Sequence, residues 1–341
     1  MEACAAGACL VTEMGRKRKR ERNLRRGVGP LLLGAIIALT GCGFASANPF
    51  DDALGAYRNQ NFDKAFQIWR TLAENGNVSA QVFLGLLYLN GQGTARDLFS
   101  AAYWYRKAAD RGNAAAQHNL GWAYQNGYGV PRDEAQAAIW YRKSAEQGNA
   151  DAQVKLASLL EYGVGLPKDL AEALKWYRIA AEKGDAKADF HIGSMYFYGE
   201  GVVRDFRQAV QWYARAADQG DPQALNNLGM MYKLGAGVPK DIVKALESFK
   251  KAADQCQAES QFNIGLLYIG SQGFPADYSK AYAWFDLAAK GSDAATRAEA
   301  ETELAYVAAK LAPDQIALAK KSPPADTSAC PAQLPFNPAS P

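Results

Sequence analysis

Histidine and cysteine are scarce in this chain of 341 residues, and their scarcity limits the chemistry that it can carry out. There are two histidines, His118 and His191, and five cysteines. The sequence contains no HExxH motif, no paired CxxC motifs and no Ser/His/Asp set, so metal-dependent and acyl-transfer sites lack the residues they need. We therefore expect no catalytic residue, no metal site and no cofactor.

A long hydrophobic run is also missing. The apolar run near the start extends from Val28 to Leu39, which is too short to span a membrane comfortably. It follows a basic block that ends at Arg26 and precedes small residues, so residues 1–47 resemble a bacterial export signal. We expect an exported protein, located in the periplasm or anchored to the outer membrane.

The end of this leader is compatible with two processing routes. Residues 39–42, LTGC, resemble a lipobox in which Cys42 would carry a lipid anchor. Residues 45–47, ASA, form an A-x-A site that would release a soluble chain by cleavage after Ala47. The lipobox directly follows the apolar run, which favours lipidation. Met14 is an alternative initiator to Met1.

An excess of positive charge is absent once the leader is set aside. Residues 1–47 contain eight of the 38 basic residues and three of the 35 acidic residues. The rest of the chain therefore has 30 basic and 32 acidic residues. The rest of the chain is therefore slightly acidic and has no basic footprint for nucleic acid. We expect no nucleic-acid partner.

The sequence does contain a repeat with a period of 36 residues. Glycines and tryptophans recur at this spacing or a multiple of it: Gly85, Gly121, Gly193, Gly229 and Gly265, and Trp104, Trp140, Trp176, Trp212 and Trp284. A fixed period of this size is typical of helical repeat arrays.

Each unit is predicted to contain two helices. In the unit at 114–149, Ala116, Leu120 and Tyr124 are four residues apart, so a first helix has one apolar stripe beside Gly121. A glycine inside a helix costs about 1 kcal/mol, and close approach of the second helix would offset that cost. The Gly-x-Gly turn after residue 126 is predicted to end the first helix.

Aspartate is predicted to begin every second helix as its N-cap. Asp133 is followed after three residues by Gln136, and Asp169 by Glu172, which is the spacing of a capping box. The remaining N-cap candidates are Asp97, Asp205, Asp241 and Asp277.

A single helix pair cannot cover its apolar face, so neighbouring pairs must stack. We predict an all-α fold, an α-solenoid of tandem antiparallel helix pairs that forms a right-handed superhelix. Residues 48–78 would form an N-terminal capping helix pair, residues 79–292 six repeats, and residues 293–321 C-terminal capping helices. Residues 322–341, of which six are proline, are predicted to be a disordered tail.

The repeated pattern AxxxLGxxYxxGxGVxxDxxxAxxWYxxAAxxG resembles the SEL-one-like repeat, a branch of the tetratricopeptide-like solenoids. The resemblance extends from about Ser79 to Lys321. It implies a non-enzymatic scaffold that assembles multiprotein complexes and regulates envelope or polysaccharide processes. The departures from the pattern are Ala157 at the glycine, Leu160 at the tyrosine, Ser248 and Phe249 at the Trp-Tyr pair, and Cys256 at the final glycine.

The side of each first helix that faces away from the second helix is predicted to line the concave groove and to hold a protein or peptide partner. Apolar side chains at these positions suggest a docking track. The alternative is that curvature buries several of them between repeats. The predicted contact residues are Leu86, His118, Trp122, Phe190, Phe197, Met230, Phe262 and Leu266.

Two further motifs are open to more than one interpretation. Cys256 and Cys330 would remain after removal of the leader, and they are either bridged or unrelated thiols. Ser248 and Lys251 match the S-x-x-K pattern of β-lactam-recognising enzymes, but the companion motifs are absent. An envelope enzyme or small-ligand binder of this kind is the alternative function, and the scaffold is favoured.

Overall fold

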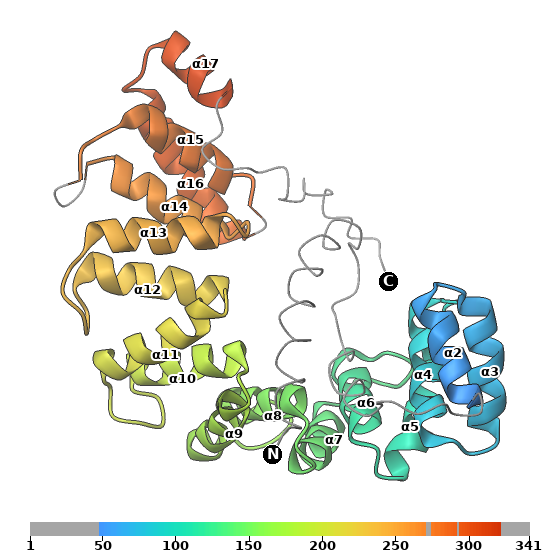
Figure 1. The fold of residues 1–341 in the computed structure, drawn as a ribbon. Helices are drawn as coiled ribbons and strands as arrows, with labels where there is room; N and C mark the ends of the chain where they lie inside the picture. Colours follow the sequence, from blue (N-terminus) through green and yellow to red (C-terminus); the bar gives the residue numbers. More distant parts are fainter. Residues whose placement is uncertain (1–47, 271–273, 292, 322–341) are drawn as a thin grey trace, which may run out of the picture. The chain divides into compact units, whose positions relative to one another are not determined.

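The computed structural model describes residues 48–270, 274–291 and 293–321 (Figure 1). Within these ranges the chain forms sixteen helices, α2 to α17, and no strand, as the sequence predicts. No helix in this part of the chain is long and apolar enough to span a membrane. The predicted leader with Cys42, the tail and Cys330 lie outside the described residues.

Twelve of the helices form six pairs, which we number as repeats one to six. The first helices are α4 (Val78–Asn90), α6 (Ala114–Asn126), α8 (Ala150–Tyr162), α10 (Ala186–Tyr198), α12 (Pro222–Leu234) and α14 (Ala258–Tyr268). The second helices are α5 (Leu98–Asp110), α7 (Glu134–Glu146), α9 (Leu170–Glu182), α11 (Phe206–Asp218), α13 (Ile242–Ala253) and α15 (Tyr278–Ala288).

Four more helices flank the repeats. They are α2 (Pro49–Arg58) and α3 (Phe62–Glu74) before repeat one, and α16 (Ala294–Ala308) and α17 (Pro313–Lys321) after repeat six. They lie where the sequence predicts capping helices, and the capping role itself stays a prediction.

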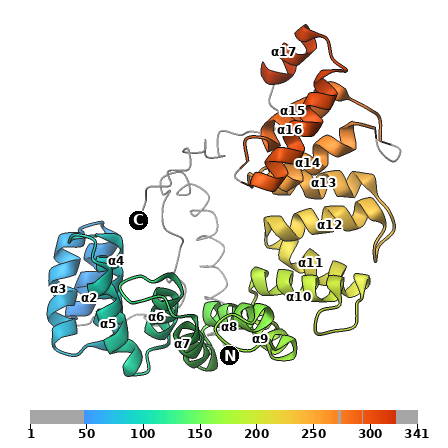
Figure 2. The same ribbon diagram turned by 180° about the vertical axis from the view of Figure 1, so that it is seen from behind.

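Each repeat helix packs mainly against the helices before and after it in the chain, as Figures 1 and 2 show from opposite sides. The buried apolar residues accordingly form a series of local clusters along the array. This arrangement of near-neighbour contacts is that of an α-solenoid.

In five of the six first helices an internal glycine receives an aromatic ring from the second helix. A Cβ atom added to Gly121 would lie 2.9 Å from Cδ1 of Tyr141, whose side chain is completely buried. The same contact joins Gly85 to Tyr105, Gly193 to Tyr213, Gly229 to Phe249 and Gly265 to Phe285. The predicted close approach is therefore confirmed.

The two aromatic residues of the Trp-Tyr pair have different partners. Tyr141 fills its own repeat, whereas Trp140 packs into a cluster that includes Leu89 and Tyr105 of the preceding repeat. Only the tryptophan therefore fills the space between two repeats. The reason is that only the tyrosine faces the bare backbone at the glycine.

The helix ends follow the predicted chemistry. All six predicted aspartates cap the second helices and accept hydrogen bonds from backbone N–H groups one turn ahead. In the Gly-x-Gly turn of repeat two, Gly127 ends α6 in the left-handed conformation, with φ of 71°. Gly129 has a second function, because a side chain there would overlap the carbonyl group of Leu98 in repeat one.

The glycine contact can be tested by adding a methyl group. In Gly193→Ala the new Cβ would lie 2.7 Å from Cδ1 of Tyr213, and overpacking of this kind costs about 1–3 kcal/mol. This cost should outweigh the gain in helix propensity of about 1 kcal/mol. We expect a lower free energy of unfolding in urea. Gly55→Ala in α2 is the matched control, because no atom lies within 4 Å of its added Cβ, and it should stabilise the chain. Equal effects of the two substitutions would contradict the contact.

Candidate interaction surface

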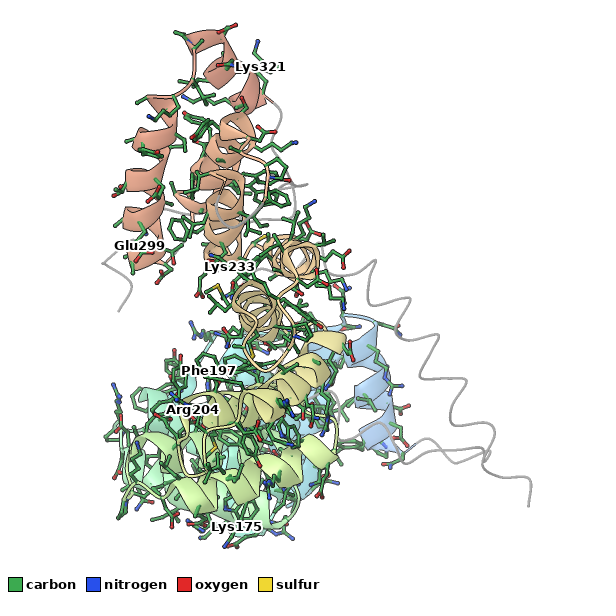
Figure 3. All side chains as sticks on the ribbon, turned by 90° about the vertical axis from the view of Figure 1, so that its left-hand side faces the viewer. Lys175, Phe197, Arg204, Lys233, Glu299 and Lys321 are labelled. Carbon is green, nitrogen blue, oxygen red and sulfur yellow. The ribbon has the colours of Figure 1, made fainter. Side chains whose placement is uncertain are left out.

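The free side of the first helices forms the candidate interaction surface, which we call the first-helix face. It is formed by four positions that share one side of each helix by the hundred-degree step. They are Ala115, Asn119, Trp122 and Asn126 in α6, and Asp151, Lys155, Ser158 and Tyr162 in α8. In α10 they are Lys187, His191, Ser194 and Tyr198, and in α12 they are Gln223, Asn227, Met230 and Leu234. All except Asn119 are exposed or half-buried. Figure 3 shows the side chains of this part of the chain.

His118 does not belong to this face, which corrects the prediction. Its side chain is completely buried, its ring packs beside that of Tyr141 at 5.5 Å between centroids, and its Nδ1 lies 3.3 Å from Oδ1 of Asn119. Burial lowers the pKa of His118. The predicted stripe was rotated toward the core by about one residue, which is why it includes a buried histidine.

The other seven predicted residues are half-buried. Trp122 and Met230 lie on the first-helix face, and Leu86 and Leu266 occupy the same repeat position. The rings of the three phenylalanines pack against neighbouring rings. The distances between ring centroids are 5.9 Å from Phe190 to Tyr213, 5.3 Å from Phe197 to Phe206, and 5.5 Å from Phe262 to Phe285. Their role in binding a partner stays a prediction.

Sequence reasoning missed the most exposed apolar side chains of the face. Tyr162, Tyr198 and Leu234 are 63%, 67% and 58% exposed, and each is the last residue of its first helix. Their signal in the sequence is a large apolar residue directly before the capping glycine at the 36-residue spacing.

The positive charge of the first helices is confined to three lysines. Lys155 lies in α8, Lys187 in α10 and Lys233 in α12, and the six first helices contain no other lysine and no arginine. Partial burial of its amine, together with the nearby charge of Lys187, lowers the pKa of Lys155. Burial also lowers the pKa of Lys233, which Figure 3 labels together with Phe197.

A buried carboxylate joins repeats three and four. Glu161 of α8 accepts a hydrogen bond of 2.6 Å from the hydroxyl of Tyr177 in α9, and Nδ1 of His191 in α10 lies 3.2 Å from its Oε2. The rings of Tyr177 and His191 are stacked, with centroids 4.7 Å apart. Burial acts to raise the pKa of Glu161, but the contacts with His191 and Tyr177 outweigh it, so that the pKa is lowered.

A recurring glutamine joins most of the other repeats. Gln81, Gln117, Gln153 and Gln261 are buried, and each side-chain amide donates to an alanine carbonyl in the last turn of the preceding second helix. The glutamine at this repeat position therefore has a structural role, because its bond joins each of these first helices to the helix before it.

Repeat four has Asp189 at this position instead. Its carboxylate is completely buried and cannot donate to Ala181, the equivalent alanine. Arg215 of α11 replaces the missing donor, because its Nη2 lies 3.1 Å from the Ala181 carbonyl oxygen and 3.2 Å from Oδ1 of Asp189. Burial raises the pKa of Asp189, and the charge of Arg215 opposes this effect only in part.

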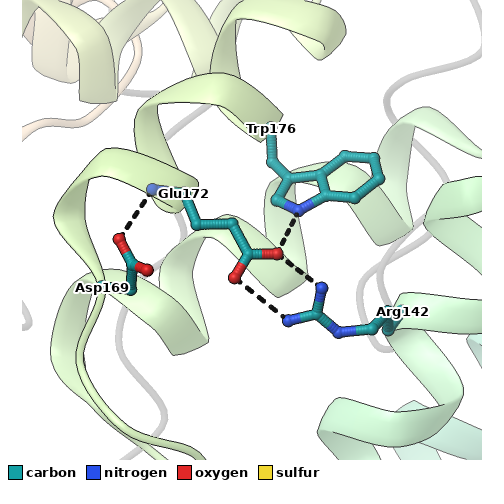
Figure 4. A network of polar contacts seen from close by, with 4 residues as sticks. All are labelled: Arg142, Asp169, Glu172 and Trp176. Carbon is teal, nitrogen blue, oxygen red and sulfur yellow. Dashed lines mark hydrogen bonds and ion pairs between the residues drawn. The ribbon is translucent and has the colours of Figure 1, made fainter.

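Several arginines of the second helices contact a neighbouring repeat. Arg106 donates to the hydroxyl of Tyr124 in the next repeat, and Arg178 to that of Tyr196 at 3.0 Å. Leu160 replaces this tyrosine in repeat three, and Arg142 pairs with Glu172 of α9 instead (Figure 4).

Glu172 therefore differs from its predicted role as a capping-box partner. Its backbone N–H donates to Asp169 at 2.8 Å, but its carboxylate binds Arg142 and accepts a hydrogen bond of 3.2 Å from Nε1 of Trp176. The side chain of Glu172 therefore contacts the preceding repeat and does not cap the end of its own helix.

Of the two residues in the S-x-x-K match, Ser248 has a structural contact and Lys251 is exposed. Ser248 is 8% exposed, and its hydroxyl donates to the carbonyl of Lys244 at 2.9 Å. Among the described residues no three His, Cys, Asp or Glu side chains are placed to hold a metal ion.

Cys256 has φ of 67°, the left-handed conformation that glycine adopts at the end of other repeats. It is disulfide-bonded, and the other four cysteines lie outside the described residues, so its pairing with Cys330 stays a prediction. It borders a cleft of about 670 Å³ that Phe262, Asn263 and Glu299 also line, where α14 meets α16.

Tandem antiparallel helix pairs, five of the six with an aromatic ring packed on a glycine, define this chain as an α-solenoid repeat protein. The Sel1 repeat family model matches residues 54–77, 78–113, 114–149, 150–185, 186–221, 222–255 and 258–293. The chain therefore belongs to the Sel1 repeat family, whose solenoids are commonly protein-interaction scaffolds and generally non-catalytic. The first match is shorter than the others and lies within the predicted N-terminal cap.

Two solved structures are similar to this chain. One is the Escherichia coli protein c5321, a protective antigen of uropathogenic strains with an SLR fold: identity is 30%, the TM-score is 0.70, and 80% of this chain and 60% of that one are covered. The other is a Sel1 repeat protein from Oxalobacter formigenes, with 34% identity, a TM-score of 0.68 and coverage of 73% and 99%. The match thus spans 60% of the length of the E. coli antigen. No curated protein matches the chain.

Asp189 makes a testable prediction about pH. Because burial raises its pKa, the folded chain binds this proton more tightly than the unfolded chain does. Stability from this site is therefore greatest below the ordinary pKa of about 4 and falls as pH rises through the raised value. Asp189→Gln, which restores the recurring residue, should remove this dependence and add about 0.5–2 kcal/mol to the free energy of unfolding at pH 7.

Gln117→Asp is the reverse exchange and should destabilise the chain, because Lys143 stands where repeat four has Arg215. Thermal unfolding of both variants between pH 4 and pH 8 makes the comparison. A loss of stability in Asp189→Gln at pH 7 would mean that the ion pair outweighs the cost of burial.

Proposed function

We propose that this protein is a non-enzymatic scaffold of the bacterial cell envelope that holds a protein or peptide partner on its first-helix face. The proposal relies mainly on one observation, a row of exposed apolar side chains at one repeat position. Tyr162, Tyr198 and Leu234 occupy this position in three consecutive repeats, and the lysines of the same face form no ion pair with a described residue. Exposed apolar side chains of this kind favour a docking surface.

The chemistry of the face favours binding over catalysis. A catalytic site would need a nucleophile beside a general base. The carboxylate of Glu161 is instead bound to Tyr177 and His191 in a structural contact. A solenoid offers a row of similar positions at a regular spacing, which suits an extended or helical partner segment.

The envelope location is supported by the sequence of the leader, with its basic block, short apolar run and small residues. Lipidation at Cys42 would anchor the solenoid to a membrane, whereas cleavage after Ala47 would release it into the periplasm. In either case the partner would be another envelope protein.

Photo-crosslinking tests the position of the partner. A benzophenone-bearing phenylalanine in place of Tyr162 or Tyr198 is close in shape to the native ring and exposed on the first-helix face. In intact cells these variants should form crosslinks to a discrete partner, identified by mass spectrometry. The matched control is the same residue at Tyr103, which is 51% exposed on α5 in a second helix. Crosslinks from Tyr103 alone would place the partner on the opposite side.

The mature N-terminus tests the location. We expect mass spectrometry of protein purified from cells to find either a lipid-modified Cys42 or a chain that begins at Asn48. Cys42→Ser should shift the protein from the membrane fraction to the soluble fraction only if the lipid is present. A mature chain that retains residues 1–40 would overturn the envelope proposal and leave a cytosolic adaptor.

A further inference from the structure

Three consecutive repeats each present one lysine from the first helix, and none of the three is neutralised. Lys155, Lys187 and Lys233 form no ion pair with any described residue. The acidic residues of the same helices differ in this respect, because Glu161 and Asp189 are buried and bound to internal partners. Asp151 is the one exposed acid in α8, α10 and α12, so three positive charges face one negative charge.

Two of these lysines lie on a continuous surface. The contact between Glu161 of α8 and His191 of α10 joins these two first helices. Lys187 precedes His191 by one helical turn, and Lys155 occupies the repeat position of His191. Both lysines are exposed on the first-helix face.

The surroundings of the lysines indicate which kind of anion would fit. Half-buried Ser158 lies one turn after Lys155 on the same face, half-buried Ser194 lies two turns after Lys187, and the exposed rings of Tyr162 and Tyr198 follow them. A nucleic-acid site needs many cations along a backbone, but beyond the leader this chain has 30 basic against 32 acidic residues. A few lysines among hydroxyl groups and rings fit a peptide with both acidic and apolar side chains.

We infer that the partner segment held across α8 and α10 is an acidic peptide stretch, whose carboxylates pair with Lys155 and Lys187 and whose apolar side chains contact Tyr162 and Tyr198. The inference rests on the proposed scaffold function and specifies the chemistry of its partner.

Two matched peptides test the inference with the protein alone. One is a fluorescent peptide in which glutamate alternates with serine and phenylalanine, and the other has glutamine at every glutamate. Fluorescence anisotropy should show tighter binding of the glutamate peptide. Its affinity should fall with added salt, because the contacts are ion pairs near the surface. Carbodiimide activation of the peptide carboxylates should form amide bonds with the amines of Lys155 and Lys187, which peptide mapping would locate.

Charge reversal separates this face from a general effect of charge. Lys155→Glu/Lys187→Glu should weaken binding of the glutamate peptide by about tenfold or more, since two attractions become repulsions. The control is Lys175→Glu/Lys250→Glu, which makes the same change in net charge at exposed positions of second helices and should bind as the unchanged chain does. Circular dichroism would verify that both variants keep their helices.

Several outcomes would overturn the inference. They are equal affinity for the two peptides, equal losses in the two double variants, or lysine-dependent binding of single-stranded DNA or phosphatidylglycerol vesicles without binding of the acidic peptide. None of these outcomes affects the crosslinking result at Tyr162 and Tyr198, which tests the scaffold function irrespective of charge. Crosslinking from those positions to a partner segment without acidic residues would keep the scaffold and remove the acidic peptide.

Discussion

The array depends on the contact between a bare glycine backbone in the first helix and an aromatic ring in the second. In five of the six repeats the ring lies against backbone that has no Cβ, and this brings the two helices of the repeat together. The ring itself matters more than its hydroxyl group. Tyr141 donates to Gln125, Tyr105 has no hydroxyl partner among the described residues, and repeats five and six use phenylalanine. Packing of an aromatic surface, rather than a hydrogen bond, therefore carries the contact.

Repeat three differs from this pattern at two positions, Ala157 and Leu160, and an additional polar contact accompanies each difference. Ala157 replaces the glycine while Tyr177 remains completely buried, with its hydroxyl bound to Glu161. Leu160 removes the tyrosine to which an arginine of the preceding repeat would donate, and Glu172 supplies another acceptor for Arg142. Polar contacts thus replace part of the usual contact chemistry where repeat three meets its neighbours.

The two sides of the array differ in how their charges are used. On the second helices, arginine and lysine side chains stabilise contacts between repeats or lie over aromatic rings, as Arg215 does at Trp212 and Lys143 at Trp140. On the first helices, buried acids hold repeats together while the lysines remain without an ionic partner. Each repeat of a solenoid depends only on its neighbours, so exposed side chains that make no contact between repeats can change without loss of the fold.

The sequence alone determined the helical repeat, its period, the N-caps and the family, because these follow from spacing along the chain and from local backbone chemistry. It also predicted the glycine contact, since a costly residue that recurs in helices needs a compensating neighbour. Only the tertiary structure decided that His118 is buried and that the side chain of Glu172 binds Arg142. It also decided that Arg215 donates the hydrogen bond that a glutamine in place of Asp189 would donate, and that Lys155 and Lys187 are on the same side of their helices. The physical reason is that an error of one residue on a helix rotates a side chain by about a hundred degrees, so that exposure and pairing depend on how neighbouring helices meet.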